Sequence, residues 1–326
     1  MRAALLTDDH VFEVVEIADP DPQPDELVLR VRACGICGSD LKAHTFLPAG
    51  SVLGHEFTGE VVAVGSAVRD SWREGQHVAS LPLIACGQCR WCLADEPAHC
   101  ERVDLLGVGA SPGAFAEYVR VGAAQTVALD ADIGQLGALV EPLAVGLHTA
   151  AMGGVKAGDN VLVIGGGNVG LAVTVWAHRL GARQVVVSDP VAARREGAAS
   201  FGATGSHDPD NDPPPRDFDV VFECVGAPGL VQTAIDAAVT RGRVVIAGVC
   251  VSADSILPVT ALVKEVEMRF AMYYRGDEFA AAARLLESGG INADAFVSGQ
   301  VTLDGITDAF SRLLTQAGDR KILVVP

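Results

Sequence analysis

The distribution of apolar and polar positions divides the chain into two parts with different patterns. In the first 140 residues, short alternating runs are separated by glycine- and proline-rich turns, as in 26–40, 59–68 and 75–84. This pattern predicts a β-rich region built of short strands. From about Glu141 onward, continuous apolar runs alternate with longer segments of helical period, which is typical of buried strands joined by helices.

The second part predicts a parallel, doubly wound sheet. Residues 160–164 form an apolar strand that is followed directly by a glycine turn and an apolar-striped helix. Further buried strands are expected within 184–189, 218–226 and 243–249, with helical stretches between them. Because strands that alternate with helices pair in parallel, this region is predicted to be α/β. After about Tyr273 the pattern returns to a helix and short strands.

Composition narrows the possible functions. The 326 residues are 49% hydrophobic, which favours two well-buried domains over one. With 41 acidic and 24 basic side chains the formal charge is −17, so nucleic acid is not an expected partner. No apolar run approaches the roughly 20 residues that span a bilayer, and the first residues lack the layout of a signal peptide. A cytoplasmic location without membrane contact is therefore expected, where thiols stay reduced.

The glycine turn has the pattern of a dinucleotide site. Gly165, Gly167 and Gly170 spell GxGxxG between a strand and a helix. In that context the glycines permit a tight turn, close approach of the backbone to a pyrophosphate, and close packing of the helix. The free N–H groups at the helix start, including those of Asn168 and Val169, would face the phosphates. This interpretation is preferred to a merely tight turn.

The end of the next strand indicates which nicotinamide cofactor is bound. Asp189 closes that strand, and a carboxylate there can accept hydrogen bonds from both adenosine ribose hydroxyls, which selects NAD over NADP. Arg194 and Arg195 follow closely and could bind a 2′-phosphate instead, although solvated helix positions are the preferred interpretation. NAD is the predicted cofactor, and Arg194 remains a candidate for the cofactor site.

Four of the eight cysteines lie within sixteen positions, at Cys86, Cys89, Cys92 and Cys100. Thiolates this close can form strained disulfides or enclose a soft metal, and reduced thiols favour the metal. Four sulfurs around a tetrahedral Zn²⁺ make a closed structural site. A zinc ribbon that binds nucleic acid is the alternative, which the negative charge disfavours.

A second set of potential zinc ligands is dispersed through the chain. Cys37, His55 and Glu56 lie in the β-rich part, and Glu141 lies at its end. One thiolate, one imidazole and one carboxylate are the ligands of a catalytic zinc that keeps a position open for water or substrate. Because these residues are far apart in sequence, no spacing rule establishes the site, and each residue alone could be structural.

These motifs together resemble the zinc-dependent medium-chain alcohol dehydrogenases. GHE-x-x-G-x-V-x-x-VG over 54–65, the four-cysteine segment, EPLAVGLH over 141–148 and GxGxxG occur in the family's order over nearly the whole chain. The sorbitol and threonine dehydrogenase branch is the most similar, because Glu141 stands where the liver-type enzymes have cysteine.

The resemblance implies a fold, cofactors and an activity. A GroES-like, β-rich catalytic domain would comprise residues 1–141 and 273–326, and a Rossmann NAD-binding domain of residues 142–272 would be inserted between them. One catalytic and one structural zinc per chain, NAD, and a homotetramer or homodimer are expected. The implied reaction is hydride transfer between NAD and a secondary alcohol or polyol and its ketone or aldehyde. The alternatives are a physiological ketone or aldehyde reductase, and an inactive zinc-containing Rossmann protein, which the intact ligand set argues against.

The resemblance also assigns the ligands of the catalytic zinc. Cys37 and His55 would bind the metal together with one carboxylate. Glu56 and Glu141 both remain candidates for that place, because the sequence does not decide which of them is bound at rest.

The residues around these ligands receive further roles from the resemblance. Ser39 matches the hydroxyl that bonds the substrate oxygen, and Asp40 matches the acid that orients the histidine ligand. Many relatives have a histidine at the position of Lys42, whereas a lysine is a poor proton acceptor at neutral pH. His44, two residues further on, or a water molecule could take its place, so the outer end of the proton path stays open.

Overall fold

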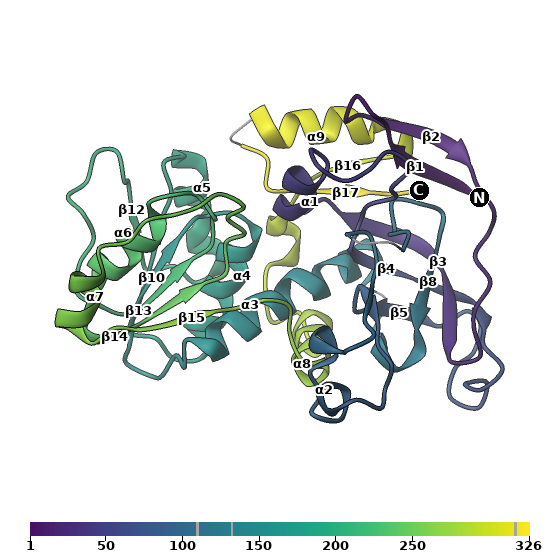
Figure 1. The fold of residues 1–326 in the computed structure, drawn as a ribbon, viewed down its shortest axis with the longest axis horizontal. Coiled ribbons are helices and arrows are strands. Elements are labelled where there is room, and N and C mark those ends of the chain that lie inside the picture. The colour runs from purple at the N-terminus through teal and green to yellow at the C-terminus, as the bar shows by residue number, and fades with distance from the viewer. Residues whose placement is uncertain (109–110, 132, 316–317) are drawn as a thin grey trace. The chain divides into compact units, whose positions relative to one another are not determined.

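The computed structural model describes the following residues: 1–108, 111–131, 133–315 and 318–326. These residues form two compact units. Unit 1 consists of Met1–Glu141 and Tyr274–Pro326, and unit 2 of Pro142–Tyr273 (Figure 1). Within the described residues, no helix has both the length and the apolar character that a membrane crossing requires.

Unit 1 is built on a mostly antiparallel sheet in the order β16-β17-β3-β4-β5-β9, with β8 also paired to β3. Its strands are β3 (Glu26–Gly35), β4 (Glu56–Val64), β5 (His77–Ser80), β8 (Tyr118–Gly122), β9 (Thr126–Ala128), β16 (Val297–Val301) and β17 (Lys321–Val324). The sheet joins both ends of the chain, because Leu323 of β17 lies opposite Gly35 of β3. The predicted β-rich part therefore needs the C-terminal segment to complete its sheet.

Smaller elements surround this sheet. The two-stranded pairs are β1 (Arg2–Leu6) with β2 (Phe12–Glu16), and β6 (Leu83–Ile84) with β7 (Asp104–Leu105). The α-helices of unit 1 are α1 (Gly38–Ala43), α2 (Arg90–Leu93), α8 (Gly276–Glu287) and α9 (Ile306–Thr315). The core between them includes the fully buried rings of Phe57 and Phe115 and the buried ring of Phe310. Helix α3 (Val140–Met152) begins at the end of the first segment of unit 1.

Unit 2 contains a six-stranded sheet in the order β12-β11-β10-β13-β14-β15, in which neighbouring strands are parallel. Its strands are β10 (Asn160–Ile164), β11 (Gln184–Ser188), β12 (Gly205–His207), β13 (Phe218–Glu223), β14 (Ala238–Ile246) and β15 (Glu267–Phe270). Its further helices are α4 (Asn168–Arg179), α5 (Ala192–Gly197), α6 (Leu230–Ala237) and α7 (Pro258–Lys264).

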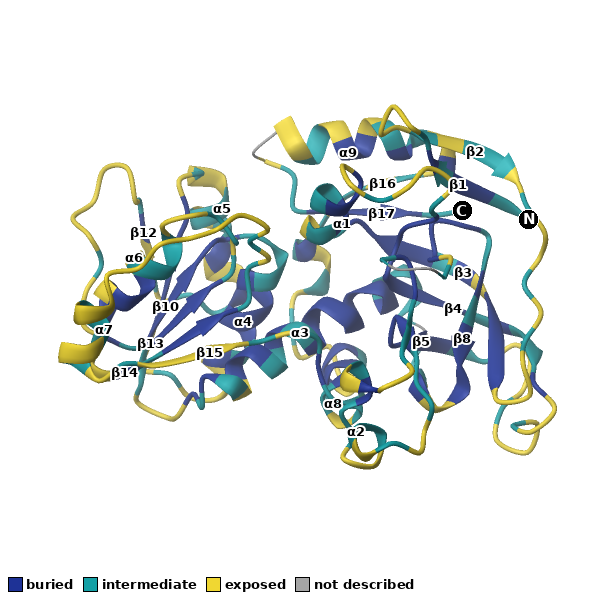
Figure 2. Ribbon diagram, in the orientation of Figure 1, coloured by how far each residue is buried: buried dark blue, intermediate teal, exposed yellow. Residues whose placement is uncertain are grey.

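The strand order of unit 2 is that of a doubly wound dinucleotide-binding fold. The chain runs outward from β10 to β12 on one side and returns through β13 to β15 on the other. The central strands are buried along most of their length, whereas α7 and β15 are largely exposed (Figure 2). In such sheets, ligands bind at the carboxyl ends of the strands where the order reverses, which here is beside β10.

Candidate active site

Strand pairing brings together three side chains that are separated in the sequence. Cys37 follows β3 and precedes α1, while His55 and Glu56 stand at the start of β4. Because β3 and β4 are antiparallel with Gly35 opposite Glu56, the end of one strand lies beside the start of the other. One potential ligand atom from each of Cys37, His55 and Glu56 lies within 4.8 Å of the others.

The residue behind His55 favours a metal at this place. Asp40 is fully buried, and its Oδ1 lies 3.1 Å from His55 Nδ1. Its other oxygen accepts the backbone N–H of Cys37 at 2.9 Å, so one carboxylate fixes two of the three potential ligands. A carboxylate at Nδ1 orients the ring and leaves Nε2 to face the site.

The charge environment of the cluster also fits a cation. Burial lowers the pKa of His55, but the charge and hydrogen bond of Asp40, together with Cys37, raise it well above its usual value. The surroundings therefore stabilise a positive charge at this position, which a divalent cation would also supply. A thiolate, an imidazole and a carboxylate are a donor set that suits Zn²⁺.

The half-buried hydroxyl of Ser39 lies on the Nε2 side of the His55 ring, which is the side that faces the site. Its Oγ is 3.3 Å from His55 Nε2, the nitrogen that Asp40 leaves available. Cys34, which forms a CxxC pattern with Cys37, is instead fully buried in the core of unit 1. Burial raises the pKa of the Cys34 thiol well above its usual value, so a reactive dithiol is not favoured here.

A buried lysine that the sequence analysis did not single out contacts the cluster. Lys321, the first residue of β17, has no exposed surface. Its ammonium donates to the carbonyl of Ile36 at 3.1 Å and to Oε2 of Glu56. Burial lowers the pKa of Lys321, but Glu56 and Cys37 raise it by more than burial lowers it, so the ammonium group stays charged. The sequence signal was a lone lysine at the head of an apolar strand.

Glu141 lies close to these groups but outside the three-residue cluster. It is buried in the first turn of α3. Burial, the largest cause, and the charge of Glu56 raise the pKa of Glu141 to about 7, although His55, Lys321 and Tyr274 act in the opposite direction. The structure thus gathers both candidate carboxylates, and gives each a different partner.

The two candidates for the outer proton path have different surroundings. Lys42 is half-buried on α1. His44 is buried, and its ring packs edge-on against Phe310 at 5.5 Å between centroids. Its Nδ1 lies 3.0 Å from the carbonyl of Leu41. Because that nitrogen is already engaged by the backbone, Nε2 is the atom through which His44 would have to carry a proton.

The four clustered cysteines form a second potential metal centre. One sulfur from each of Cys86, Cys89, Cys92 and Cys100 lies within 4.8 Å of the others, and all four are free thiols. The Sγ atoms of Cys89 and Cys92 are 3.5 Å apart, and Sγ of Cys100 accepts the backbone N–H of Cys86 at 3.3 Å. Four thiolates with this spacing suit a tetrahedral Zn²⁺. We call residues 85–103 the cysteine lobe.

The glycine loop of unit 2 has the geometry that its sequence predicts. Gly165 has a φ of 103°, a left-handed conformation that other residues rarely adopt. A Cβ at Gly170 would collide with the carbonyl oxygen of Gly165, so the helix packs closely on the turn. Gly167 is the N-cap of α4, and Asn168 and Val169 form its first turn. Backbone N–H groups there can bind phosphate.

Asp189 lies at the end of β11, next to this loop. Its side chain is buried, with Oδ2 accepting the N–H of Gly166 and Oδ1 that of Val191, each at 2.9 Å. Two backbone donors hold the carboxylate in one orientation beside the glycine turn. This is the place at which a carboxylate can accept hydrogen bonds from an adenosine ribose.

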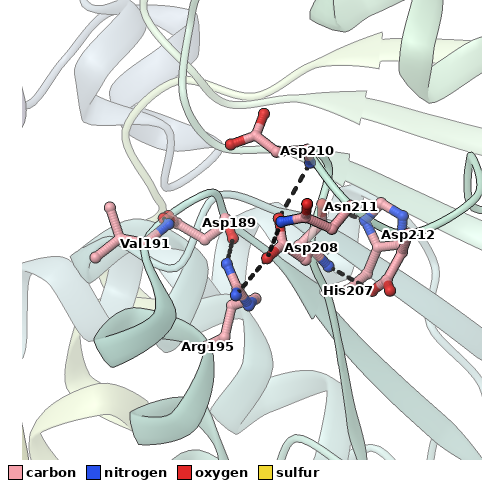
Figure 3. Close-up of polar contacts among 9 residues, drawn as sticks. Asp189, Val191, Arg195, His207, Asp208, Asp210, Asn211 and Asp212 are labelled. Carbon is pink, nitrogen blue, oxygen red and sulfur yellow. Dashed lines mark hydrogen bonds and ion pairs between the residues drawn. The ribbon is translucent and has the colours of Figure 1, made fainter.

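The two arginines after Asp189 behave differently. Arg195 donates to the backbone carbonyl of Asp189 and to the carboxylate of Asp208, both at 2.6 Å (Figure 3). It is therefore anchored, and not solvated as the sequence suggested. Arg194 is less restrained, with Nη1 3.8 Å from Oδ2 of Asp189. Of the pair, only Arg194 is free to turn toward a ligand without breaking a short ion pair.

Comparison with known proteins agrees with this arrangement. The family model "Alcohol dehydrogenase GroES-like domain" matches residues 23–131, and "Zinc-binding dehydrogenase" matches residues 168–288. The chain is 32% identical to 2-dehydro-3-deoxy-L-galactonate 5-dehydrogenase of Pseudoalteromonas atlantica, covering 99% of this chain and 98% of that protein. It is 29% identical to sorbitol dehydrogenase of Bacillus subtilis, covering 100% and 97%.

A solved structure is similar over the same length. The NADP-bound structure of a protein from Sinorhizobium meliloti 1021 matches with a TM-score of 0.90 and 34% identity, covering 100% of this chain and 99% of that one. The predicted fold class, a GroES-like domain with a Rossmann domain, is confirmed, and with it an enzyme that uses zinc and a nicotinamide cofactor. The chain belongs to the zinc-dependent medium-chain alcohol dehydrogenases.

Proposed function

We propose that this enzyme oxidises a secondary alcohol or polyol reversibly with NAD, at a zinc ion held by Cys37, His55 and Glu56. The observation that carries the proposal is the convergence of these three side chains, with Asp40 behind the imidazole and Ser39 in front of it. Relatives named for sorbitol and for (R,R)-butanediol support the substrate class.

The protein's own residues have distinct tasks in this reaction. When bound, zinc would supply a Lewis acid that lowers the pKa of the substrate hydroxyl. Asp40 keeps the Nδ1 proton of His55, and so presents Nε2 to the site. The Ser39 hydroxyl, 3.3 Å from that nitrogen, is placed to receive the substrate proton and pass it on.

We propose that either Lys42 or His44 carries the proton in the outer step of this path. Alanine variants of each would identify the carrier by chemical rescue. A loss of kcat that added methylamine restores would assign Lys42, and a loss that imidazole restores would assign His44. If neither variant loses turnover, water carries the proton.

We assign the third resting ligand to Glu56, because it belongs to the three-residue cluster and Glu141 does not. Glu141 is then the neighbouring carboxylate that lines the site. Competition with a chromogenic chelator tests the assignment, because Glu56→Gln should weaken zinc binding more than Glu141→Gln. The reverse order would make Glu141 the ligand.

The surroundings of Asp189 support NAD over NADP. A 2′-phosphate about 4 Å from the carboxylate would be repelled by about 4 kcal/mol at an effective dielectric constant near 20. Arg195 is held by Asp208, which leaves Arg194 as the nearby cation. An exposed pair of this kind contributes about 1 kcal/mol or less. The repulsion should dominate, and kcat/KM should favour NAD by at least about 100-fold.

We propose that the cysteine lobe holds the second, structural zinc of each chain. Its four thiolates leave no ligand position open for a substrate. The metal would therefore stabilise a lobe that has only a four-residue helix of its own, α2, and the short turn 97–99.

We also propose that the enzyme is a homo-oligomer that forms through the outer edge of unit 2. Exposed apolar side chains gather on the last strand and the helix before it: Val259, Leu262, Val263, Met268 and Phe270. A two-fold axis through Met268 would pair β15 with its own copy in antiparallel fashion and set Glu267 against Arg269 of the second chain. Light scattering should give the molar mass of a dimer or tetramer, and Met268→Lys should lower the molar mass of the assembly.

The activity is tested by following NADH absorbance while secondary alcohols, polyols and threonine are offered. Cys37→Ala is the control, because it removes one zinc ligand and leaves the residues of unit 2 unchanged. Turnover of a secondary alcohol or polyol by the wild type alone supports the proposal. Absence of turnover across the panel by the zinc-loaded wild type would contradict it.

A further inference from the structure

Asp95 is tied to the thiolates of the cysteine lobe. It follows α2, and its backbone N–H donates to the carbonyl of Cys92 at 3.1 Å. Its φ is 59°, which fixes the direction of its side chain in a left-handed conformation. A residue with this backbone, three positions after one thiolate and five before Cys100, moves with the lobe.

The side chain of Asp95 leaves the lobe and reaches the beginning of α8. Its Oδ2 accepts the backbone N–H of Asp277 at 2.9 Å, across 182 residues of sequence, and Figure 1 shows α2 and α8 close together. Helix N-termini require acceptors for their first N–H groups, and a carboxylate also complements the helix dipole. The N-cap residue Arg275 has no side-chain oxygen, so Asp95 supplies that acceptor from a distant segment.

The fit of Asp95 against α8 is close. A Cβ at Gly276 would collide with Oδ1 of Asp95, so the carboxylate occupies the space that a larger residue would need. The other end of the helix is fixed as well, because Glu287 accepts the backbone N–H of Ala131 at 2.8 Å. Helix α8 is thus held at both ends by residues of the first segment of unit 1.

Helix α8 in turn positions a side chain of the candidate active site. Tyr274, two residues before the helix, is buried and stacks on Phe279 of α8, with ring centroids 5.5 Å apart and planes at 18°. Phe279 is fully buried. The Tyr274 hydroxyl lies near enough to Glu141 to lower the pKa of its carboxyl group. A continuous set of contacts therefore leads from the lobe through α8 to the second carboxylate of the site.

We propose that Asp95 is a positioning residue: it fixes the N-terminus of α8 to the cysteine lobe and thereby holds Tyr274 against Glu141. The inference rests on the proposed function, in which Glu141 lines the zinc site. It gives the lobe a second task besides its own stability, which is to set the geometry of the active site in the same unit. A carboxylate that is misplaced by about 1 Å can lower turnover up to about 100-fold.

Four variants of the zinc-loaded enzyme test the contact itself. Asp95→Ala should lower kcat about tenfold or more, with the KM for NAD changed less than twofold and two zinc ions retained. Asp95→Asn should restore most of kcat, because its amide oxygen can still accept the Asp277 N–H. Gly276→Ala, which disturbs the same contact from the helix, should reproduce the loss. Glu101→Ala, an exposed acid on the same lobe, is the matched control and should resemble the wild type.

A double-mutant cycle tests whether the effect passes through Tyr274. If it does, Asp95→Ala should lower kcat much less in a Tyr274→Phe background than in the wild type. Hydrogen exchange gives a readout independent of turnover, since the Asp277 amide should exchange at least tenfold faster in Asp95→Ala and not in Glu101→Ala.

The outcomes separate this inference from the proposed function. A wild-type kcat in Asp95→Ala would overturn the inference. It would also be overturned if the losses of kcat in Asp95→Ala and Tyr274→Phe added fully in the double variant, or if Asp95→Ala lost one zinc ion together with its activity. Wild-type turnover by Glu141→Ala would instead overturn the role of Glu141 in the proposed function. An inactive Glu141→Ala with an unaffected Asp95→Ala refutes the inference alone.

Discussion

Lys321→Met removes one buried charge and keeps an unbranched side chain of similar length. Lys321 has no exposed surface, and the Glu56 side chain that it contacts is 2% exposed. In the zinc-free protein the variant would leave Glu56 as a buried carboxylate without its cation. In the zinc-loaded enzyme the metal would face the same carboxylate, so the loss should be smaller.

The expected loss of unfolding free energy follows from the burial of both Lys321 and Glu56. Removing one member of a buried ion pair typically costs about 3–5 kcal/mol. With an m-value near 3 kcal/mol/M, the urea midpoint of the zinc-free protein should fall by about 1 M or more. With zinc bound, the loss should fall to about 1 kcal/mol, which is about 3 kcal/mol less than in the zinc-free protein. This difference in unfolding free energy must appear as zinc affinity, so the variant should bind zinc roughly 100-fold more tightly than the wild type.

The assay is urea unfolding of both proteins with zinc bound and after chelation, together with zinc competition. Lys264→Met is the matched control, because Lys264 donates to the carbonyls of Ile235, Asp236 and Ala238 in unit 2. Its effect on stability should be the same with and without zinc. An equal loss for Lys321→Met in both states would refute the placement of Glu56 at the metal.

Further variants test the two proposed zinc sites and the proposed cofactor site. Elemental analysis should find about two zinc ions per chain, and a mild chelator should abolish activity before the fold is lost; one zinc with full activity would remove one site. Cys37→Ala should abolish turnover and leave NAD binding intact, whereas Cys100→Ala should lower the thermal unfolding midpoint; normal turnover by Cys37→Ala would contradict the mechanism. Ser39→Ala should lose turnover and keep its zinc, as measured by metal analysis, and zinc loss would make Ser39 structural. Asp189→Ser should reduce the preference for NAD in kcat/KM, and equal use of both cofactors by the wild type would assign the pocket to the arginines.

Local patterns in the sequence determined the architecture of unit 2. A continuous apolar run fixes a strand that is buried on both faces. The turn after it requires a left-handed backbone conformation at Gly165, which glycine adopts easily and other residues do not. Such constraints act over a few residues, so they can be read from the sequence. The four clustered cysteines are local for the same reason, because fourteen positions separate the first from the last.

The cluster of Cys37, His55 and Glu56, our candidate zinc site, could be predicted only in part from the sequence. Cys37 and His55 were recognisable through their motifs, but whether Glu56 or Glu141 joins them depends on how β4 and α3 are placed. The structure puts Glu56 in the cluster because Gly35 and Glu56 face each other in a strand register that no single residue dictates.

Contacts between distant segments were decided by the tertiary structure alone. Lys321 lies 265 residues from Glu56 in the sequence, and Asp95 lies 182 residues from the amide that it caps. As isolated letters, these are a lysine in an apolar strand and an acid in a loop, and neither residue type indicates a partner. The role of Lys321 arises because the closing of the sheet by β17 removes its charge from water, where an unpaired charge is costly. The role of Asp95 arises because the packing of α8 brings the first N–H groups of that helix to the Asp95 carboxylate.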